Sequence, residues 1–92
     1  MTLLVLNGPN LNLLGTREPE TYGTTTLADI EADLDATFSE VTLRFEQENS
    51  EGLLIDHLHA AHEDRVDGVV FNPGGYTHTS VALRDAVAAI DP

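Results

Sequence analysis

The chain has 92 residues, 41% of them hydrophobic, which allows one small domain with a modest core. It contains neither cysteine nor lysine, which excludes disulfides, cysteine metal sites and a side-chain Schiff base within it. Sixteen acidic residues against four arginines give a net charge of −12, which disfavours nucleic acid as a partner. No apolar run is long enough to cross a membrane, and the first residues lack the basic segment of a secretory signal, so we expect a cytoplasmic protein.

The first half of the chain alternates between strand and helix patterns. Leu3–Leu6 is continuously apolar, as in a buried parallel strand. Thr26–Asp29 has the pattern of a capping box, and it opens a helix with one apolar stripe. That stripe consists of Leu27, Ile30, Leu34 and Phe38. Val41–Gln47 then alternates strictly, with Val41, Leu43 and Phe45 facing in, which predicts a half-buried strand at a sheet edge.

The second half repeats the alternation. A helix capped by Asn49 or Ser50 is predicted to run to about Asp64. Its packing face carries Leu54, Leu58 and Ala61. Asp67–Asn72 is a third apolar strand, and Asn72–Tyr76 is a turn. The last helix is expected to start between Thr77 and Ser80, with Leu83, Val87 and Ile90 on its packing face.

The order of these elements predicts an α/β fold with a parallel sheet and right-handed crossovers. A flavodoxin-like three-layer sandwich places the first strand between the second and the third. The third strand would then be an exposed apolar edge, which proteins avoid. We therefore expect residues 1–92 to form a single incomplete domain, truncated after the third βα unit, with further strands following Pro92 or supplied by another chain.

The loop from Asn7 to Tyr22 is unusually long for a compact domain, and such loops are commonly functional. Three leucines in it (Leu11, Leu13 and Leu14) are expected to anchor it. Arg17 and Tyr22 are candidates for proton chemistry, because an adjacent cation favours the phenolate of a group that otherwise titrates near 10. The alternative is an ordinary surface loop with a solvated arginine and a half-buried tyrosine.

The loop from Asn72 to His78 leaves the same edge of the predicted sheet, so the two loops should meet across one site. Gly74 and Gly75 allow backbone N–H groups to approach a ligand, and the helix start favours an anion such as a carboxylate. His78 and Asp85, seven residues apart, would share one helix face. The alternatives are a plain tight turn and a capping or solvated histidine.

Other motifs carry little weight. The three histidines His57, His59 and His62 lie on one predicted helix, but without a cysteine or an HExxH pattern we expect surface or packing roles and no metal. No Walker loop, GxGxxG or GxSxG sequence is present, so nucleotide binding and serine hydrolysis have little support. The acidic surface would suit a salt-rich cytoplasm, although a merely acidic protein is an equal alternative.

Two stretches together resemble a known family. The segment NGPNLNLLGTREPETYG, residues 7–23, resembles the opening signature of the type II 3-dehydroquinate dehydratases, and NPGGYTHTSVALRDA, residues 72–86, is similar to their second signature. The resemblance implies a flavodoxin-like fold and a homododecamer built from trimers. It also implies dehydration of 3-dehydroquinate to 3-dehydroshikimate in the shikimate pathway, through an enolate, without a cofactor, metal or Schiff base.

The resemblance also implies roles for individual residues. Tyr22 matches the base that removes a proton beside the carbonyl, and Arg17 matches the arginine that stabilises its phenolate. Asn10 matches the asparagine that holds a water against the enolate oxygen. Asn72 and His78 match residues that bind substrate hydroxyls, and Asp85 matches an aspartate that reaches a neighbouring subunit's site.

The sequence departs from the family pattern in one respect. Family chains continue with a Glu-x-His element whose histidine protonates the leaving hydroxyl, followed by a serine and an arginine that contact the substrate. None of these is present in residues 1–92, so we expect this chain alone to be nearly inactive and poorly stable. The alternatives are a non-catalytic flavodoxin-like binding or scaffolding module and, less favoured, a phosphate- or nucleotide-binding protein.

Overall fold

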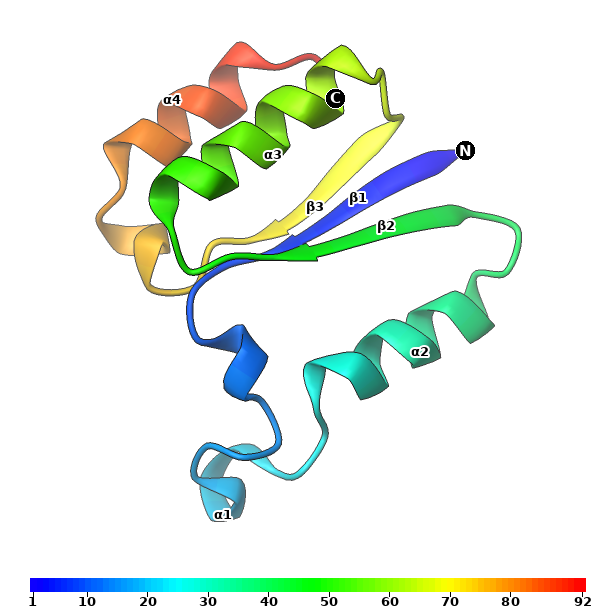
Figure 1. The fold of residues 1–92 in the computed structure, drawn as a ribbon, viewed down its shortest axis with the longest axis vertical. Helices are drawn as coiled ribbons and strands as arrows, with labels where there is room; N and C mark the ends of the chain where they lie inside the picture. Colours follow the sequence, from blue (N-terminus) through cyan, green and yellow to red (C-terminus); the bar gives the residue numbers. More distant parts are fainter.

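The structure is a computed structural model that describes residues 1–92 except for the side chain of Tyr22. Three strands alternate with helices, and two short 3₁₀ helices, η1 and η2, follow the first and third strands (Figure 1). In chain order the elements are β1 (Thr2–Asn7), η1 (Leu11–Leu13), α1 (Pro19–Tyr22), α2 (Leu27–Thr37), β2 (Thr42–Gln47), α3 (Glu51–Glu63), β3 (Gly68–Asn72), η2 (Gly74–His78) and α4 (Val81–Ala89). No helix among the described residues is long and apolar enough to cross a bilayer.

The strands form a parallel sheet in the order β2-β1-β3, which confirms the predicted topology and the edge position of β2. Val5 in the central strand lies opposite Phe45 on one side and Val70 on the other. Because each crossover is right-handed and the two crossovers run in opposite directions, their helices fall on opposite faces. Figure 1 shows α3 and α4 on one side of the strands and α2 on the other.

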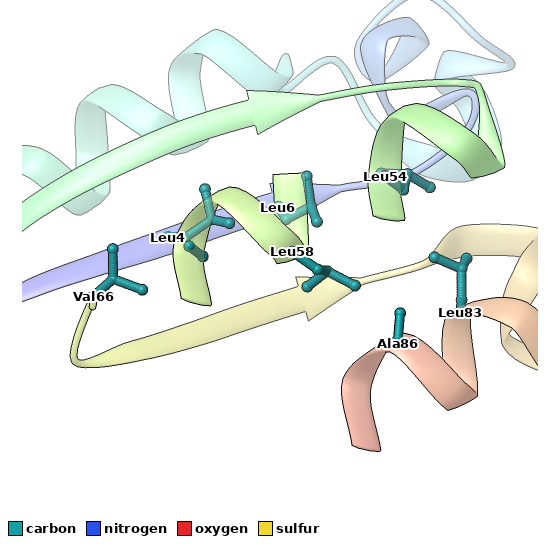
Figure 2. Close-up of a cluster of buried hydrophobic side chains, with 8 residues drawn as sticks. Leu4, Leu6, Leu54, Leu58, Val66, Leu83 and Ala86 are labelled. Carbon is teal, nitrogen blue, oxygen red and sulfur yellow. The ribbon is translucent and has the colours of Figure 1, made fainter. Parts of the chain in front are cut away.

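The hydrophobic core lies between the sheet and the α3–α4 layer (Figure 2). Leu4 and Leu6 of β1 are 1% and 0% exposed, and they point toward Leu54 and Leu58 of α3. Their alternation along β1 places both side chains on the same face of the sheet. The cluster is completed by Ala61, Val66, Leu83 and Ala86.

The opposite face is covered much less. No residue of α2 is buried, and Ile30 and Phe38 in its predicted stripe are 38% and 51% exposed. Val70 of β3 is 58% exposed. The apolar stripe of α2 therefore exists in the sequence, but within residues 1–92 it only partly covers the sheet.

Two assignments of side-chain direction need correction. The strand register puts Arg44 on the same face as Leu4, and its Nη1 donates to Asp64 Oδ2 at the end of α3, 3.0 Å away. The face of β2 that carries Arg44 was predicted to face solvent, but it lies on the side of the sheet covered by α3 and α4. The face that carries Phe45 was predicted to face the core, and it lies on the side of α2. In α4, Leu83 is buried and Ile90 packs against the core as predicted, but Val87 is 49% exposed and the neighbouring Ala86 is buried in its place.

Candidate active site

The two loops predicted to converge are packed backbone against backbone. The N–H of Gly8 donates to the carbonyl of Asn72 over 2.8 Å. A Cβ atom on Gly8 would lie 2.7 Å from the Pro73 carbonyl oxygen, so only glycine fits there without a shift. Gly74 adopts φ +60°, and a Cβ on it would lie 3.2 Å from the carbonyl oxygen of Pro9. Glycines at these two positions allow the loop after β1 and the loop after β3 to form one surface.

A pocket of about 440 Å³ lies where these loops meet, at the carboxyl edge of the sheet. Predicted residues from both loops line it together, as the strand order implied. The lining consists of Pro9, Asn10, Leu11, Leu14, Arg17, Gly74 and Gly75. Leu11 and Leu14 are half-buried and contribute the apolar part of the wall, whereas Leu13, the third predicted anchor, is 44% exposed.

Asn10 has an unusual backbone conformation, with φ 69° and ψ −4° in the left-handed region. Asparagine is one of the few residues other than glycine that enter this region readily. The N–H of Asn10 donates to Asn49 Oδ1 over 3.0 Å, and Asn10 is one of the residues that line the pocket. The start of the loop is therefore fixed by a contact from the end of β2.

Arg17 brings a positive charge to the pocket, with 54% of its side chain exposed. Its backbone N–H donates to the carbonyl of Leu13 over 3.0 Å, which closes the turn after η1. Glu18 Oε2 lies 3.9 Å from Arg17 Nε, a long and solvated ion pair that adds little stability. The predicted base, Tyr22, is the last residue of α1, and its side chain lies outside the described part of the structure.

Asn72 closes β3 and shapes the second loop. Its Oδ1 accepts the N–H of Gly74 over 3.1 Å, a local turn that asparagine side chains favour. The oxygen keeps a second lone pair and the amide nitrogen keeps its donors, so this exposed side chain can still accept from or donate to a hydroxyl.

His78 and Asp85 do not line the pocket. His78 ends η2 and borders a separate hollow of about 270 Å³ with Thr77, Ser80 and Arg84. Thr79 breaks the helical path with φ −128°, and α4 begins only at Val81, so the prediction that His78 and Asp85 share a helix face is wrong. Asp85 lies exposed on α4.

The three histidines of α3 have separate surroundings. His57 Nε2 lies 2.8 Å from Glu48 Oε2, and His62 Nδ1 accepts the N–H of Asp91 over 3.1 Å. His59 is exposed. Within the described residues, no three histidine or acidic side chains gather as a metal ion would require.

Sequence reasoning missed the contribution of β2 to this site. Gln47 Nε2 donates both to the Gly8 carbonyl and to Asn49 Oδ1, each over 3.1 Å. The sequence did contain an indication of this contribution. The second strand was predicted to lie beside the first in a parallel sheet, so the carboxyl end of β2 must reach the same sheet edge as the loop after β1. Two amide side chains at that end are suited to holding neighbouring loop backbone.

Comparison with known proteins assigns a family to this arrangement. The family profile described as "Dehydroquinase class II" matches residues 1–92. A 3-dehydroquinate dehydratase of Ralstonia pickettii is 59% identical over 90 residues, which cover 96% of this chain and 58% of that protein. A catabolic 3-dehydroquinase of Aspergillus oryzae is 55% identical, over 98% of this chain and 60% of that protein.

A solved structure agrees in shape as well as in sequence. The type II dehydroquinase of Butyrivibrio crossotus superposes with a TM-score of 0.90 and 41% identity, covering 96% of this chain and 62% of that chain. The chain thus spans about three-fifths of the relatives it matches, and the match includes both loops of the pocket. The fold, the two signature loops and these similarities together place the chain in the class II dehydroquinase family.

Proposed function

We propose that this chain provides the base side of an active site that dehydrates 3-dehydroquinate to 3-dehydroshikimate. The observation that carries the proposal is the pocket that joins Asn10 and Arg17 of the first loop to the glycine pair of the second. The chain that forms this pocket is similar to proteins named 3-dehydroquinate dehydratase. Its volume of about 440 Å³ is in the range of small-molecule sites.

In the proposed reaction, Tyr22 as phenolate removes the proton on the carbon beside the ketone. The electron pair of that C–H bond moves onto the carbonyl oxygen and gives an enolate. Asn10 holds a water against this oxygen, which stabilises charge where it develops. When the enolate oxygen re-forms the carbonyl, the electron pair of the enolate carbon–carbon double bond makes the new double bond to the carbon that bears the hydroxyl. The carbon–oxygen bond to that hydroxyl breaks, and the hydroxyl leaves as water with a donated proton. The proton donor of this last step is assigned to no residue of 1–92.

The position of Arg17 suits the role of keeping Tyr22 ionised. A guanidinium beside a phenol favours the charged form, and Arg17 directly precedes the short segment that leads to Tyr22. Arg17 is also the one charged side chain among the described residues that line the pocket.

The remaining residues have binding roles in the proposal. Asn72 and His78 do not line the pocket, but they belong to the same loop as its glycine pair, and we assign them to substrate hydroxyls that extend beyond it. The glycine pair with the following helical turn receives the substrate from the side of the second loop. Asp85 lies exposed on α4 and away from the pocket, which suits an aspartate that acts in a neighbouring subunit. We accordingly propose a homo-oligomer, a homododecamer built from trimers, that acts in the cytoplasm without a cofactor.

The direct test replaces Tyr22 by phenylalanine in the protein as its gene encodes it. Tyr22→Phe removes the phenol oxygen and keeps the ring, so we expect turnover of 3-dehydroquinate to fall by at least about 10³-fold, toward the upper range for loss of a positioned base. The measurement is the appearance of the conjugated product by ultraviolet absorbance. The circular dichroism spectrum should be unchanged.

The matched control is the other tyrosine of the chain. Tyr76 lies half-buried in η2, and its hydroxyl donates over a long 3.4 Å to the Asn49 carbonyl, so Tyr76→Phe should keep most of the activity. If Tyr22→Phe retained full turnover, the base assignment would be wrong. If the unmodified protein bound 3-dehydroquinate without converting it, a non-catalytic binding module would be the better description.

A further inference from the structure

A hydrogen-bonded clamp, formed by the side chains of Gln47 and Asn49, lies beside the pocket at the end of β2. Asn49 Oδ1 receives two donors, the backbone N–H of Asn10 over 3.0 Å and Gln47 Nε2 over 3.1 Å. Gln47 Nε2 also donates to the carbonyl of Gly8 over 3.1 Å. The two amide side chains therefore hold the backbone at both Gly8 and Asn10, near the start of the loop that follows β1.

The chemistry of the clamp fixes its orientation. A backbone N–H can only donate, so the Asn49 atom that faces Asn10 must be the carbonyl oxygen. The same oxygen then requires a donor from Gln47, and the remaining hydrogen of that amide group reaches Gly8. Each group can satisfy its partner in only one way, so the network specifies a single arrangement.

The strand register explains why residues of β2 reach this point. Asn7, Gln47 and Asn72 lie at the same level, as partners across the three strands. The N–H of Glu48 donates to the Asn7 carbonyl over 3.0 Å, which carries the pairing one residue past β2. Asn49 therefore leaves the sheet directly beside the loop that begins at Gly8.

The clamp acts on the residue whose placement matters most to the proposed chemistry. The backbone of Asn10 is in the left-handed region, which asparagine enters more readily than most residues and which surrounding contacts must still favour. The hydrogen bond from its N–H is one such contact. A rotation of that peptide would change how Asn10 presents itself to the pocket that it lines.

We propose that Asn49, held in place by Gln47, is a positioning residue that orients Asn10 for stabilisation of the developing enolate. Its effect on turnover rests on the proposed function, whereas its effect on the Asn10 backbone does not. Asn49 is exposed, so its hydrogen bonds compete with water and contribute little to global stability. The role is one of local geometry, and its removal should leave a folded protein.

The first measurement is independent of catalysis. In the protein as its gene encodes it, amide hydrogen exchange of Asn10 is followed by NMR for the unmodified protein, Asn49→Ala and Asn49→Asp. Loss of the acceptor in Asn49→Ala should speed exchange at Asn10 by about tenfold, the worth of one net hydrogen bond. Asn49→Asp keeps an oxygen of the same reach and should restore protection to within about threefold, because a carboxylate also accepts.

The second measurement is kinetic. Asn10 acts on charge that appears only in the transition state, so Asn49→Ala should lower kcat by about tenfold or more and change KM by less than about threefold. Asn12→Ala is the matched control, since it removes another exposed asparagine of the same loop, and it should change neither measurement. If Asn49→Ala failed to fold, Gln47→Met would free the Asn49 side chain while keeping the volume of residue 47, with the same expected effects.

The outcomes separate the two proposals. Unchanged exchange at Asn10 in Asn49→Ala would overturn the clamp, and so would a variant whose KM rises while kcat is kept. The clamp would also be overturned if exchange at Asn10 were faster in Asn49→Ala and Asn49→Asp did not restore protection. Loss of the hydrogen-bond acceptor would then not be the cause of the faster exchange. An unmodified protein that does not dehydrate 3-dehydroquinate would overturn the proposed function, and the exchange result would still decide the clamp.

Discussion

Gly8 is the residue at which the two halves of the site come closest together. Its N–H bonds to the Asn72 carbonyl, and the place of a Cβ atom is taken by the carbonyl of Pro73. In the sequence, Gly8 has the appearance of a simple turn residue after a strand. Its importance comes from a segment more than sixty residues away, so only the folded chain reveals it.

A methyl group at this position should therefore be costly. Gly8→Ala forces an atom to within 2.7 Å of the Pro73 backbone, and we expect a loss of about 1–3 kcal/mol in the free energy of unfolding, as for other overpacked sites. Urea denaturation measures the change. Gly75→Ala is the control, because a Cβ there meets nothing within 4 Å. Equal stability of the two variants would contradict the close approach of the loops.

At the scale of elements, the start of α2 was predicted correctly from neighbouring residues, whereas the packing of α2 depends on segments distant in the sequence. Thr26 and Asp29 form the predicted capping box, with Asp29 Oδ2 accepting the Thr26 N–H over 3.0 Å and Thr26 Oγ1 accepting the Asp29 N–H over 3.1 Å. The box needs only neighbouring residues, so sequence predicts it well. The coverage of the stripe on α2 depends on other segments, and within residues 1–92 two of its four members, Ile30 and Phe38, stay exposed.

The capping box should make the stability of α2 depend on pH. The hydrogen bond from the Thr26 backbone, followed by that with its hydroxyl, lowers the pKa of Asp29 below its ordinary value near 3.8. A lowered pKa stabilises the folded state above the unfolded pKa, and this contribution is lost as pH falls through the folded pKa. Asp29→Ala should thus lower the melting temperature at pH 7 by more than it does at pH 2.

The measurement is a series of thermal melts between these two pH values. Asp33→Ala is the matched control, because it removes another exposed carboxylate from the same helix while leaving the capping box in place. A difference between Asp29→Ala and the unmodified protein that stayed constant across the series would show that the carboxylate does not stabilise the helix start.

At the scale of the whole molecule, charge is the dominant feature. The net charge of −12 is spread over a flat body whose extents are 39 × 35 × 16 Å, so most carboxylates lie near the surface. Salt shortens the range of their repulsion from about 10 Å at 0.1 M to about 3 Å at 1 M. Repulsion of this kind opposes the compact state and is relieved by counterions.

We therefore expect the melting temperature to rise by roughly 5 °C or more between 0.1 M and 1 M sodium chloride. A variant with three neutralised acids on α2 (Glu31→Gln, Asp33→Asn and Asp35→Asn) should show a smaller rise, because less repulsion remains to be screened. A melting temperature that is flat or falls with salt would count against adaptation to a salt-rich cytoplasm.

The sequence by itself determined the order of the elements, the parallel sheet with β1 at its centre, and the meeting of two loops at one edge. Each of these follows from local patterns and from the handedness of crossovers, which any chain must obey. The tertiary structure decided the backbone contact at Gly8, the separation of His78 from Asp85 and the support of Asn10 by Gln47 and Asn49. These depend on strand register and on distances between segments far apart in the chain, which no local pattern encodes.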